Sequence, residues 1–192
     1  MVKIARSWSE ALRVVGIDAH CEVTDLGSAQ FFMDYQAGTV DDDEYLGNLA
    51  QYLCITEIEA ARAHAGILMM EYAEVGALVA QLHGAGIVTG CLSNTNALHW
   101  KDLTDPNCFP SIASLRFQMA SHVLKMSKPH SEIYDAFRNE VGFHPQDIVF
   151  FDDSPTNIEA AISLGWRAHH IDPHTETAPQ MVAHLQAEGM CL

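Results

Sequence analysis

Residues 148–161 read IVFFDDSPTNIEAA, an apolar run that stops at two adjacent aspartates and continues into a helical pattern. Large apolar residues in an unbroken run, Ile148 to Phe151, are typical of a strand buried on both faces of a parallel sheet. Ser154 is placed to cap the next helix, with Pro155 in its first turn and Gly165 after its end. The stretch predicts a strand–turn–helix unit with two carboxylates at the carboxyl end of its strand.

The residues around this unit continue the alternation. The pattern predicts strands over residues 87–92, 117–120 and 166–171, and a helix over residues 131–141. Apolar strands that alternate with helices are the pattern of a doubly wound α/β fold, in which helices cover both faces of a parallel sheet. We therefore expect this fold class for the second part of the chain.

The first 84 residues show only helical periodicity. Apolar residues recur at helical spacing and stop at a glycine: Trp8, Ala11, Leu12, Val15 and Gly16. Asp18 and Asp41 are placed to cap two further helices, and another helix is expected over residues 72–83. We predict a helical cap at residues 5–66 and the α/β core at residues 67–192.

Composition excludes several classes of function. The net charge of −15 opposes binding to nucleic acid, although a bound metal can still attract one small phosphorylated molecule into a pocket. No apolar run approaches the ~20 residues of a membrane span, and the start of the chain lacks the apolar segment of a signal peptide. The five cysteines are scattered without paired spacing, so we expect reduced thiols. These features predict a cytoplasmic protein that spans no membrane.

Polar residues follow the predicted strands where ligands bind in an open parallel sheet, at the carboxyl ends. The polar residues at this edge are Ser93, Asn94, Lys128, Asp152, Asp153 and Asn157. Hydroxyl and amide donors hold phosphate oxygens, a lysine neutralises their charge, and carboxylates bind Mg²⁺, which prefers oxygen ligands. Together these residues predict a phosphoryl site with a magnesium ion.

Each signal has a structural alternative when it is taken alone. A Ser-Asn pair after a strand is usually a turn or a helix cap, and a Lys-Pro pair before a helix is usually at the surface. Adjacent aspartates repel each other and therefore need a cation or a lysine nearby. The eleven histidines are interpreted as surface or supporting residues. The order and spacing of the signals make the combination specific.

Three of these segments resemble the motifs of the haloacid dehalogenase-like superfamily. Residues 92–96, LSNTN, resemble its second motif, Lys128-Pro129 resembles the third, and residues 148–161 are similar to the fourth. The bacterial sugar-phosphate phosphatases, including alpha-D-glucose-1-phosphate phosphatases, are the most similar branch. The resemblance covers residues 72–172 and extends weakly to that branch's small helical cap.

The resemblance implies a role for each matched residue. Ser93 and Asn94 would bind the phosphoryl group, and Lys128 would stabilise the phosphorylated intermediate and pair with an aspartate. Asp153 would bind Mg²⁺ directly, whereas Asp152 would orient Lys128 or bind the metal through water. Asn157 would support the metal-binding loop. The implied activity is Mg²⁺-dependent hydrolysis of a small phosphorylated metabolite, with Ser93, Lys128 and Asp152 as the catalytic residues present.

The segment before Lys128 departs from the family pattern. It carries Val123 and Lys125 where the family often has an acid and a glycine. The resemblance therefore predicts the position of the lysine but not the conformation of this loop.

The family's nucleophile is an aspartate at the end of its first, central strand, and no strand with such a motif precedes the helical segment here. Thr24-Asp25-Leu26-Gly27 looks similar, but Cys21-Glu22-Val23 is a poor buried strand, and we interpret this segment as part of a helix. Asp18 and Asp34 are better interpreted as a helix cap and a surface acid. We expect the central strand to be missing from the chain as given, which would leave the chain inactive by itself.

Two other functions remain open: a non-catalytic module that binds phosphate and metal, and a haloacid dehalogenase. The aspartate pair favours metal-dependent phosphoryl transfer over metal-free dehalogenation. The aromatic residues Phe31, Tyr35 and Tyr45 could contact a leaving group, but we interpret them first as the core of the cap. The sequence indicates neither the substrate nor the oligomeric state.

Overall fold

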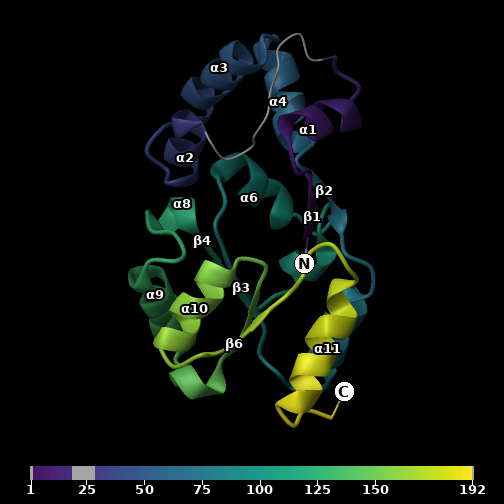
Figure 1. Ribbon diagram of the computed structural model, residues 1–192, viewed down its shortest axis with the longest axis vertical. Helices are drawn as coiled ribbons and strands as arrows, with labels where there is room; N and C mark the ends of the chain where they lie inside the picture. The colour runs from purple at the N-terminus through teal and green to yellow at the C-terminus, as the bar shows by residue number, and fades with distance from the viewer. Residues whose placement is uncertain (1, 19–28, 192) are drawn as a thin grey trace.

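The computed structural model describes residues 2–18 and 29–191 of the chain. Helices α1 to α4 gather at one end of the molecule, and the parallel strands with the remaining helices form the other end (Figure 1). The polypeptide enters near the junction of the two parts, crosses the helical part and then continues into the α/β part.

The helical part comprises α1 (Trp8–Val14), α2 (Gln30–Gln36), α3 (Asp42–Leu53) and α4 (Glu57–Ala65). The predicted cap at Asp41 is confirmed, since its side chain accepts a hydrogen bond from the Glu44 amide. The helices enclose their own apolar core, in which Trp8 and Tyr45 are fully buried. Tyr35 is also buried, so Tyr35 and Tyr45 belong to this core, as their first interpretation expected.

The prediction of helices alone over the first 84 residues is wrong in one respect. Strand β1 (Val2–Ile4) pairs antiparallel with β2 (Leu68–Glu71), and this ribbon lies where the helical part meets the α/β part. Short strands that pair across more than sixty residues leave no local alternation in the sequence, because each has only three or four residues to display it.

The α/β prediction is confirmed by two pairs of parallel strands. Strand β3 (Gly90–Ser93) pairs with β4 (Phe117–Ala120), and β5 (Val149–Asp152) pairs with β6 (Arg167–His170). Within the described residues the two pairs share no hydrogen bonds, so each pair is a two-stranded sheet. Strands β3 and β5 each carry one edge without a partner strand among the residues that the structure describes.

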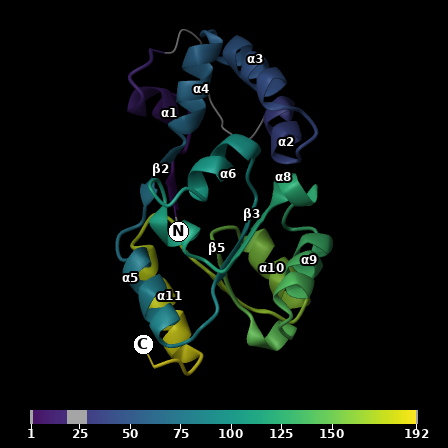
Figure 2. The ribbon, with the colours of Figure 1, turned by 180° about the vertical axis from the view of Figure 1, so that it is seen from behind.

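Helices cover the two pairs on both faces (Figures 1 and 2). On one face α9 (Ser131–Val141) and α10 (Pro155–Ser163) form an apolar cluster with Leu92 and Phe150. On the other face α5 (Val75–Gly84) and α11 (Thr177–Ala187) contact Val149 and Phe151. The shorter helices are α6 (Ala97–Leu103), α7 (Pro110–Ala113), α8 (Ser121–Leu124) and the 3₁₀ turn η1 (Pro145–Asp147). Neighbouring residues of β5 thus face opposite helical layers, as in a doubly wound fold.

Among the described cysteines, one departs from the expectation of reduced thiols. Cys91, Cys108 and Cys191 are free thiols, but Cys54, which follows the last residue of α3, is part of a disulfide bond. Spacing in the sequence does not reveal this bond, because disulfide partners need proximity in space and not a motif. The parts of the chain that are described contain no helix with the length and hydropathy of a membrane span.

Two further predictions concern segments that lie partly or wholly outside the described residues. The segment with Asp25 lies outside the described residues, and so does most of the helix that Asp18 was expected to cap. Ser154 does occupy the N-cap position of α10, with Pro155 in the first turn, but its side chain makes no capping hydrogen bond.

Candidate functional site at the carboxyl ends of the strands

A buried ion pair lies at the end of β5. The Lys128 ammonium nitrogen is 2.6 Å from Asp152 Oδ2, and the two side chains are only 8% and 6% exposed. The ammonium group also lies 5.4 Å from the centre of the Phe150 ring, a distance typical of a cation–π contact. Burial removes water from both charges, so each partner is the main compensation for the other.

The second oxygen of Asp152 binds the beginning of α10. Asp152 Oδ1 accepts hydrogen bonds of 2.9 Å from the Ser154 amide and from Asn157 Nδ2. Asn157 is buried, and its carbonyl oxygen accepts a 2.9 Å hydrogen bond from the Tyr134 hydroxyl. Burial, with the nearby Asp152 carboxylate, raises the pKa of Tyr134 above its usual range, so this phenol stays a hydrogen-bond donor. Asp152 is therefore held by partners on both of its oxygens.

Asn94 joins the end of β3 to the same site. Its side-chain amide donates to the Lys128 carbonyl oxygen and accepts from the Lys128 amide, both at 2.9 Å. This two-point contact fixes the backbone of the lysine, although the two residues are 34 positions apart in the chain. The structure thus brings Asn94, Lys128, Asp152 and Asn157 into one continuous chain of hydrogen bonds.

The other two predicted residues lie beside this chain. Ser93 is the last residue of β3, directly before Asn94, and it is half-buried. Asp153 is exposed, and its carbonyl oxygen accepts a 3.0 Å hydrogen bond from His170 Nε2. Among the described residues the Asp153 carboxylate has no ion pair. Within the part of the chain that the structure describes, no hydrogen bond joins the Ser93 hydroxyl to this chain of hydrogen bonds, so Ser93 lies next to it in the sequence without being linked to it.

These donors fit Mg²⁺ as a partial coordination shell. Asp153 offers an exposed carboxylate, whereas both oxygens of Asp152 already have partners. Within the described residues no three acidic, histidine or cysteine side chains form a cluster that could hold a metal. Mg²⁺ does not need one, because it commonly binds through one or two carboxylates and completes its octahedron with water and phosphate oxygens.

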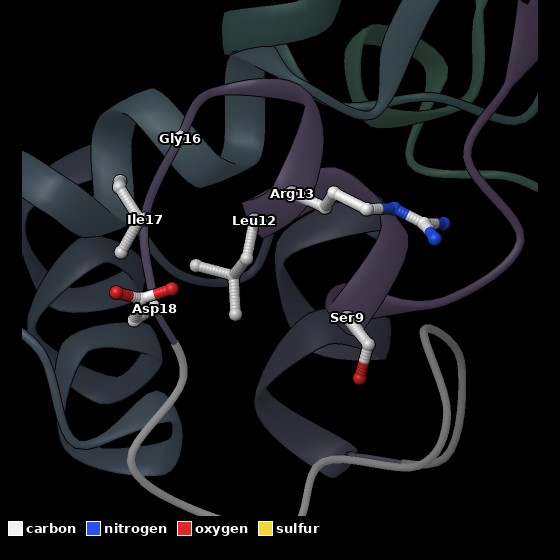
Figure 3. A pocket seen from close by; sticks show the side chains of 6 residues that line it. All are labelled: Ser9, Leu12, Arg13, Gly16, Ile17 and Asp18. Atoms are coloured by element: carbon white, nitrogen blue, oxygen red, sulfur yellow. The ribbon is translucent and has the colours of Figure 1, made fainter.

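Two pockets lie apart from this site. One has a volume of about 390 Å³ and is lined by residues of α1 and the segment after it, from Ser9 to Asp18 (Figure 3). The other, of about 570 Å³, lies between the helical part and the α/β part, with Tyr35, Asp42, Ala97 and His122 among its lining residues. Neither pocket is lined by the residues predicted for the phosphoryl site, although Tyr35, which could contact a leaving group, lines the second pocket.

The sequence did not indicate a second polar cluster, which lies where the helical part meets α6. Its buried members are Tyr45, His64, Asn96 and His99. His64 and His99 were interpreted as surface or supporting residues, yet they are 2% and 5% exposed. Their only sequence signal was Asn96, which falls within the LSNTN segment and forms the N-cap of α6.

Parallel strands covered on both faces, with a lysine, amides and carboxylates at their carboxyl ends, define an α/β protein whose polar side chains gather at the edge where such sheets bind ligands. The comparison with known families then identifies the group. Residues 4–165 match the family described as haloacid dehalogenase-like hydrolase. The chain belongs to this hydrolase family.

Solved structures show the same fold. A predicted haloacid dehalogenase-like hydrolase from Porphyromonas gingivalis is 22% identical, with a TM-score of 0.78 over 96% of this chain and 92% of that chain. A magnesium complex of a family enzyme from Bacteroides thetaiotaomicron is also 22% identical, with a TM-score of 0.78 over 94% of this chain and 92% of the other. A mutant of that enzyme was solved with magnesium and inorganic phosphate, at 22% identity and a TM-score of 0.76 over 94% and 93% of the two chains.

Proposed function

We propose that this hydrolase family member serves the Mg²⁺-dependent hydrolysis of small phosphate monoesters, with sugar phosphates as the first candidates. The observation that carries the proposal is the hydrogen-bonded chain from Asn94 through Lys128 and Asp152 to Asn157. The Bacteroides enzyme with the same fold was solved with magnesium and inorganic phosphate, which supports the choice of ligands.

In this proposal the phosphate group lies between the ends of β3 and β5. Ser93 and Asn94 bind its oxygens, and the Lys128 ammonium group stabilises its negative charge. Because Lys128 is already paired with Asp152, the site needs additional positive charge to attract a phosphate dianion into a protein of net charge −15. We therefore expect phosphate binding to depend on Mg²⁺.

The metal would be held by Asp153 directly and by Asp152 through water, with Asn157 supporting the loop. Mg²⁺ supplies charge that polarises the phosphoryl oxygens and orients the ester. Asp152 has a separate task here, since its contacts with Lys128 and Asn157 hold the lysine and the start of α10 in position. Ser93, Lys128 and Asp152 are thus the proposed catalytic residues of the described chain.

The family resemblance assigns the nucleophile to a strand-end aspartate, and no such motif was found in the sequence. We infer that the chain of 192 residues binds phosphate and Mg²⁺ without turning over an ester by itself. This inference is about the 192-residue chain and does not concern the hydrolase activity of the family as a whole.

The test is a ³¹P NMR titration of the chain with inorganic phosphate, with and without Mg²⁺, together with assays for phosphate release from p-nitrophenyl phosphate. Mg²⁺-dependent binding that is reduced at least tenfold in Asp153→Asn supports the proposed site. The control is Asp135→Asn, which removes an exposed carboxylate on α9 and should leave binding unchanged. Unchanged binding in Asp153→Asn would remove Asp153 from the site. Phosphate release by the chain would contradict only the inference that it does not turn over.

Two alternatives make different predictions in the same assays. A non-catalytic binding module would hold Mg²⁺ and phosphate without turnover even in a longer chain that carries a nucleophile. A dehalogenase would release halide from 2-chloropropionate. That alternative draws on an L-2-haloacid dehalogenase from Xanthobacter autotrophicus, which shares 18% identity and has a TM-score of 0.56. The carboxylate pair at the end of β5 favours the metal-dependent reaction.

The cellular setting stays a prediction. A small phosphorylated metabolite, rather than a nucleic acid, is the partner that the acidic composition favours. A cytoplasmic location was expected from the sequence, but the disulfide bond at Cys54 weighs against it, because disulfides are rare in reducing compartments. Fractionation of the source cells would decide between the two.

A further inference from the structure

A closed set of hydrogen bonds joins the helical part to the loop that follows β3. The Tyr45 hydroxyl is 2.7 Å from His64 Nδ1, and His64 Nε2 is 3.1 Å from Asn96 Oδ1. Asn96 Nδ2 is 3.3 Å from His99 Nδ1, and His99 Nε2 is 2.9 Å from the His64 carbonyl oxygen. Tyr45 and His64 come from α3 and α4, whereas Asn96 and His99 belong to the cap and first turn of α6.

The positions of the protons in this set follow from the His64 carbonyl oxygen, which can only accept a hydrogen bond. Because the His64 carbonyl oxygen accepts, His99 must carry its proton on Nε2, and its Nδ1 then accepts from the Asn96 amide. Asn96 Oδ1 already accepts from the His99 backbone amide, so it also accepts from His64 Nε2. His64 Nδ1 is then free of a proton and accepts from the Tyr45 hydroxyl. Both imidazoles are neutral and have the same tautomer.

A second proton on either ring would break the set. A proton on His99 Nδ1 would face the Asn96 amide hydrogens, and rotating the Asn96 amide would lose its bonds to His64 and to the α6 backbone. The two rings are also stacked, with their centres 3.8 Å apart, so two positive charges would repel at short range. Burial and the neighbouring His99 ring hold the pKa of His64 well below its usual range, and burial lowers the pKa of His99.

Other ionisable groups around the rings do not supply a fixed compensating charge. Tyr35 stacks on Tyr45, and burial raises the pKa of both phenols, so they stay neutral. Asp42 accepts from the Tyr35 hydroxyl rather than from a histidine. Asp102, on α6, raises the pKa of His99, but the lowering by burial is larger. Protonation of the pair thus remains unfavourable in the closed arrangement.

The same loop reaches the candidate site. Asn96 is separated from Asn94 only by Thr95, whose amide donates a 2.9 Å hydrogen bond to Ser121 Oγ. Asn94 holds the Lys128 backbone, so the loop is fixed on one side by the lysine and on the other by the two histidines. A displacement of α4 relative to α6 would therefore move the predicted phosphate-binding loop.

We propose that His64, His99 and Asn96 form a latch between the helical cap and the Ser93–Asn96 loop, and that this latch closes only while both imidazoles are neutral. His64 and His99 are positioning residues in this proposal. Acid opens the junction, moves the cap away from α6 and loosens Asn94 at the ligand site. The part that concerns the ligand rests on the proposed function, whereas the latch itself does not.

The sign of the effect follows from the lowered pKa values. Well above pH 6.5 the histidines are neutral in both the closed and the open junction, and pH has little effect. Below pH 6.5 the open junction takes up protons that the closed junction excludes, so opening becomes more favourable as the pH falls. With two such histidines, the opening equilibrium should increase about 100-fold between pH 7.5 and 5.5, and with one histidine about 10-fold.

The experiment is amide hydrogen exchange of the whole chain by NMR, corrected for the intrinsic exchange rate. The reporter is the Leu98 amide, because it donates to the Tyr35 hydroxyl across the junction at 3.2 Å. The Arg167 amide, bonded to the Ile148 carbonyl oxygen between β5 and β6, reports on opening elsewhere. We use a His122→Gln background, because His122 contacts the same junction and its pKa is also lowered by burial.

We expect exchange at Leu98 to rise about 100-fold over this range and exchange at Arg167 to change much less. Replacing His99 by Gln should reduce the rise to about 10-fold, and replacing both His64 and His99 should abolish it. The exposed His144→Gln is the control and should leave the rise unchanged.

If the substituted chains do not fold, the ¹⁵N shifts of the unsubstituted histidines still test the latch. Neutral rings protonated on Nε2 at pH 7.5 are expected, and any other tautomer would overturn the proposal. A pH-independent Leu98 exchange would also overturn it. Phosphate binding is measured separately at pH 7.5, so its absence with an intact latch would contradict only the proposed function.

Discussion

Lys128 and Asp152 form the buried ion pair of the candidate site. Both are almost fully buried, and the remaining oxygen of Asp152 holds the start of α10. Removing one partner leaves a buried charge without compensation, which is far costlier than losing a surface ion pair. At the scale of single residues, the site is therefore also a structural joint between β5, α10 and the loop that carries the lysine.

Lys128→Met should lower the free energy of unfolding by about 3–5 kcal/mol, because it leaves the Asp152 carboxylate buried and unpaired. Arg138→Met is the matched control, since its ion pair with Asp135 is exposed and should contribute less than about 1 kcal/mol. Urea denaturation of the two variants gives the comparison. Equal losses would mean that water reaches Asp152 and that the pair is not effectively buried.

The order and spacing of the family's motifs singled out four residues that the structure joins by hydrogen bonds, Asn94, Lys128, Asp152 and Asn157. Their role in a ligand site stays a prediction. The pairing of Lys128 with an aspartate was expected, and the structure shows that the aspartate is Asp152. The contact of Asn94 with the Lys128 backbone was not predictable, since it depends on how two loops meet in space. The same holds for His64 and His99, whose burial comes from the packing of α4 against α6 and leaves no local signal.

At the scale of elements, the turn that follows α2 lies close to the backbone of α8 at Gly38. This glycine has a φ of +70°, and a Cβ added to it would lie 2.6 Å from the His122 carbonyl oxygen. The turn between α2 and α3 therefore requires glycine at this position for two reasons: the backbone conformation is unfavourable for other residues, and a side chain would have no space. The predicted turn at Gly38 is confirmed, while the close approach to α8 was visible only in the structure.

Gly38→Ala and Gly142→Ala should differ although both have a positive φ. Gly142 follows α9, and a Cβ there would meet nothing within 4 Å, so its substitution costs about 1 kcal/mol from backbone strain alone. Gly38→Ala adds a clash with backbone and should lower the melting temperature distinctly further. Thermal unfolding of both variants measures the difference. Similar shifts would mean that α2 moves away from α8 at little cost.

Element boundaries were predictable where local signals were strong. The strand at residues 117–120 and the helix at residues 131–141 coincide with β4 and α9, because apolar runs and helical periodicity are local properties. The antiparallel ribbon of β1 and β2 was missed, since neither strand is long enough to show alternation. Strand order could not be read either, because pairing is decided by contacts between distant segments.

At the scale of the whole molecule, the α/β part consists of two parallel pairs between common helical layers. The carbonyl oxygens of Ile148 and Asp152 accept hydrogen bonds from Arg167, in β6, and from Ile171, directly after β6. The alternate residues of β5 therefore direct their backbone groups to the other edge. By the same alternation Thr89 and Cys91 face β4, and Leu92 faces the other edge of β3. The edges of β3 and β5 that lack a partner strand among the described residues thus have defined backbone donors.

We expect the Leu92 amide to exchange with solvent at least ten times faster than the Cys91 amide, and Phe151 faster than Phe150 in the same way. Each comparison uses neighbouring residues in one strand, so the free energy of global unfolding affects both exchange rates equally. Hydrogen exchange followed by NMR gives the four rates under one condition. Equal protection within each pair would show that another backbone segment covers these edges.

These strand edges also affect how protein molecules associate in solution. A strand edge without a hydrogen-bonded partner is a template on which another chain can extend the ladder of hydrogen bonds, which makes it a nucleus for assembly. The net charge of −15 opposes such contacts by mutual repulsion, and salt screens this repulsion. We expect solutions of the protein to scatter more light as sodium chloride is raised at constant pH, with colloidal stability greatest at low ionic strength.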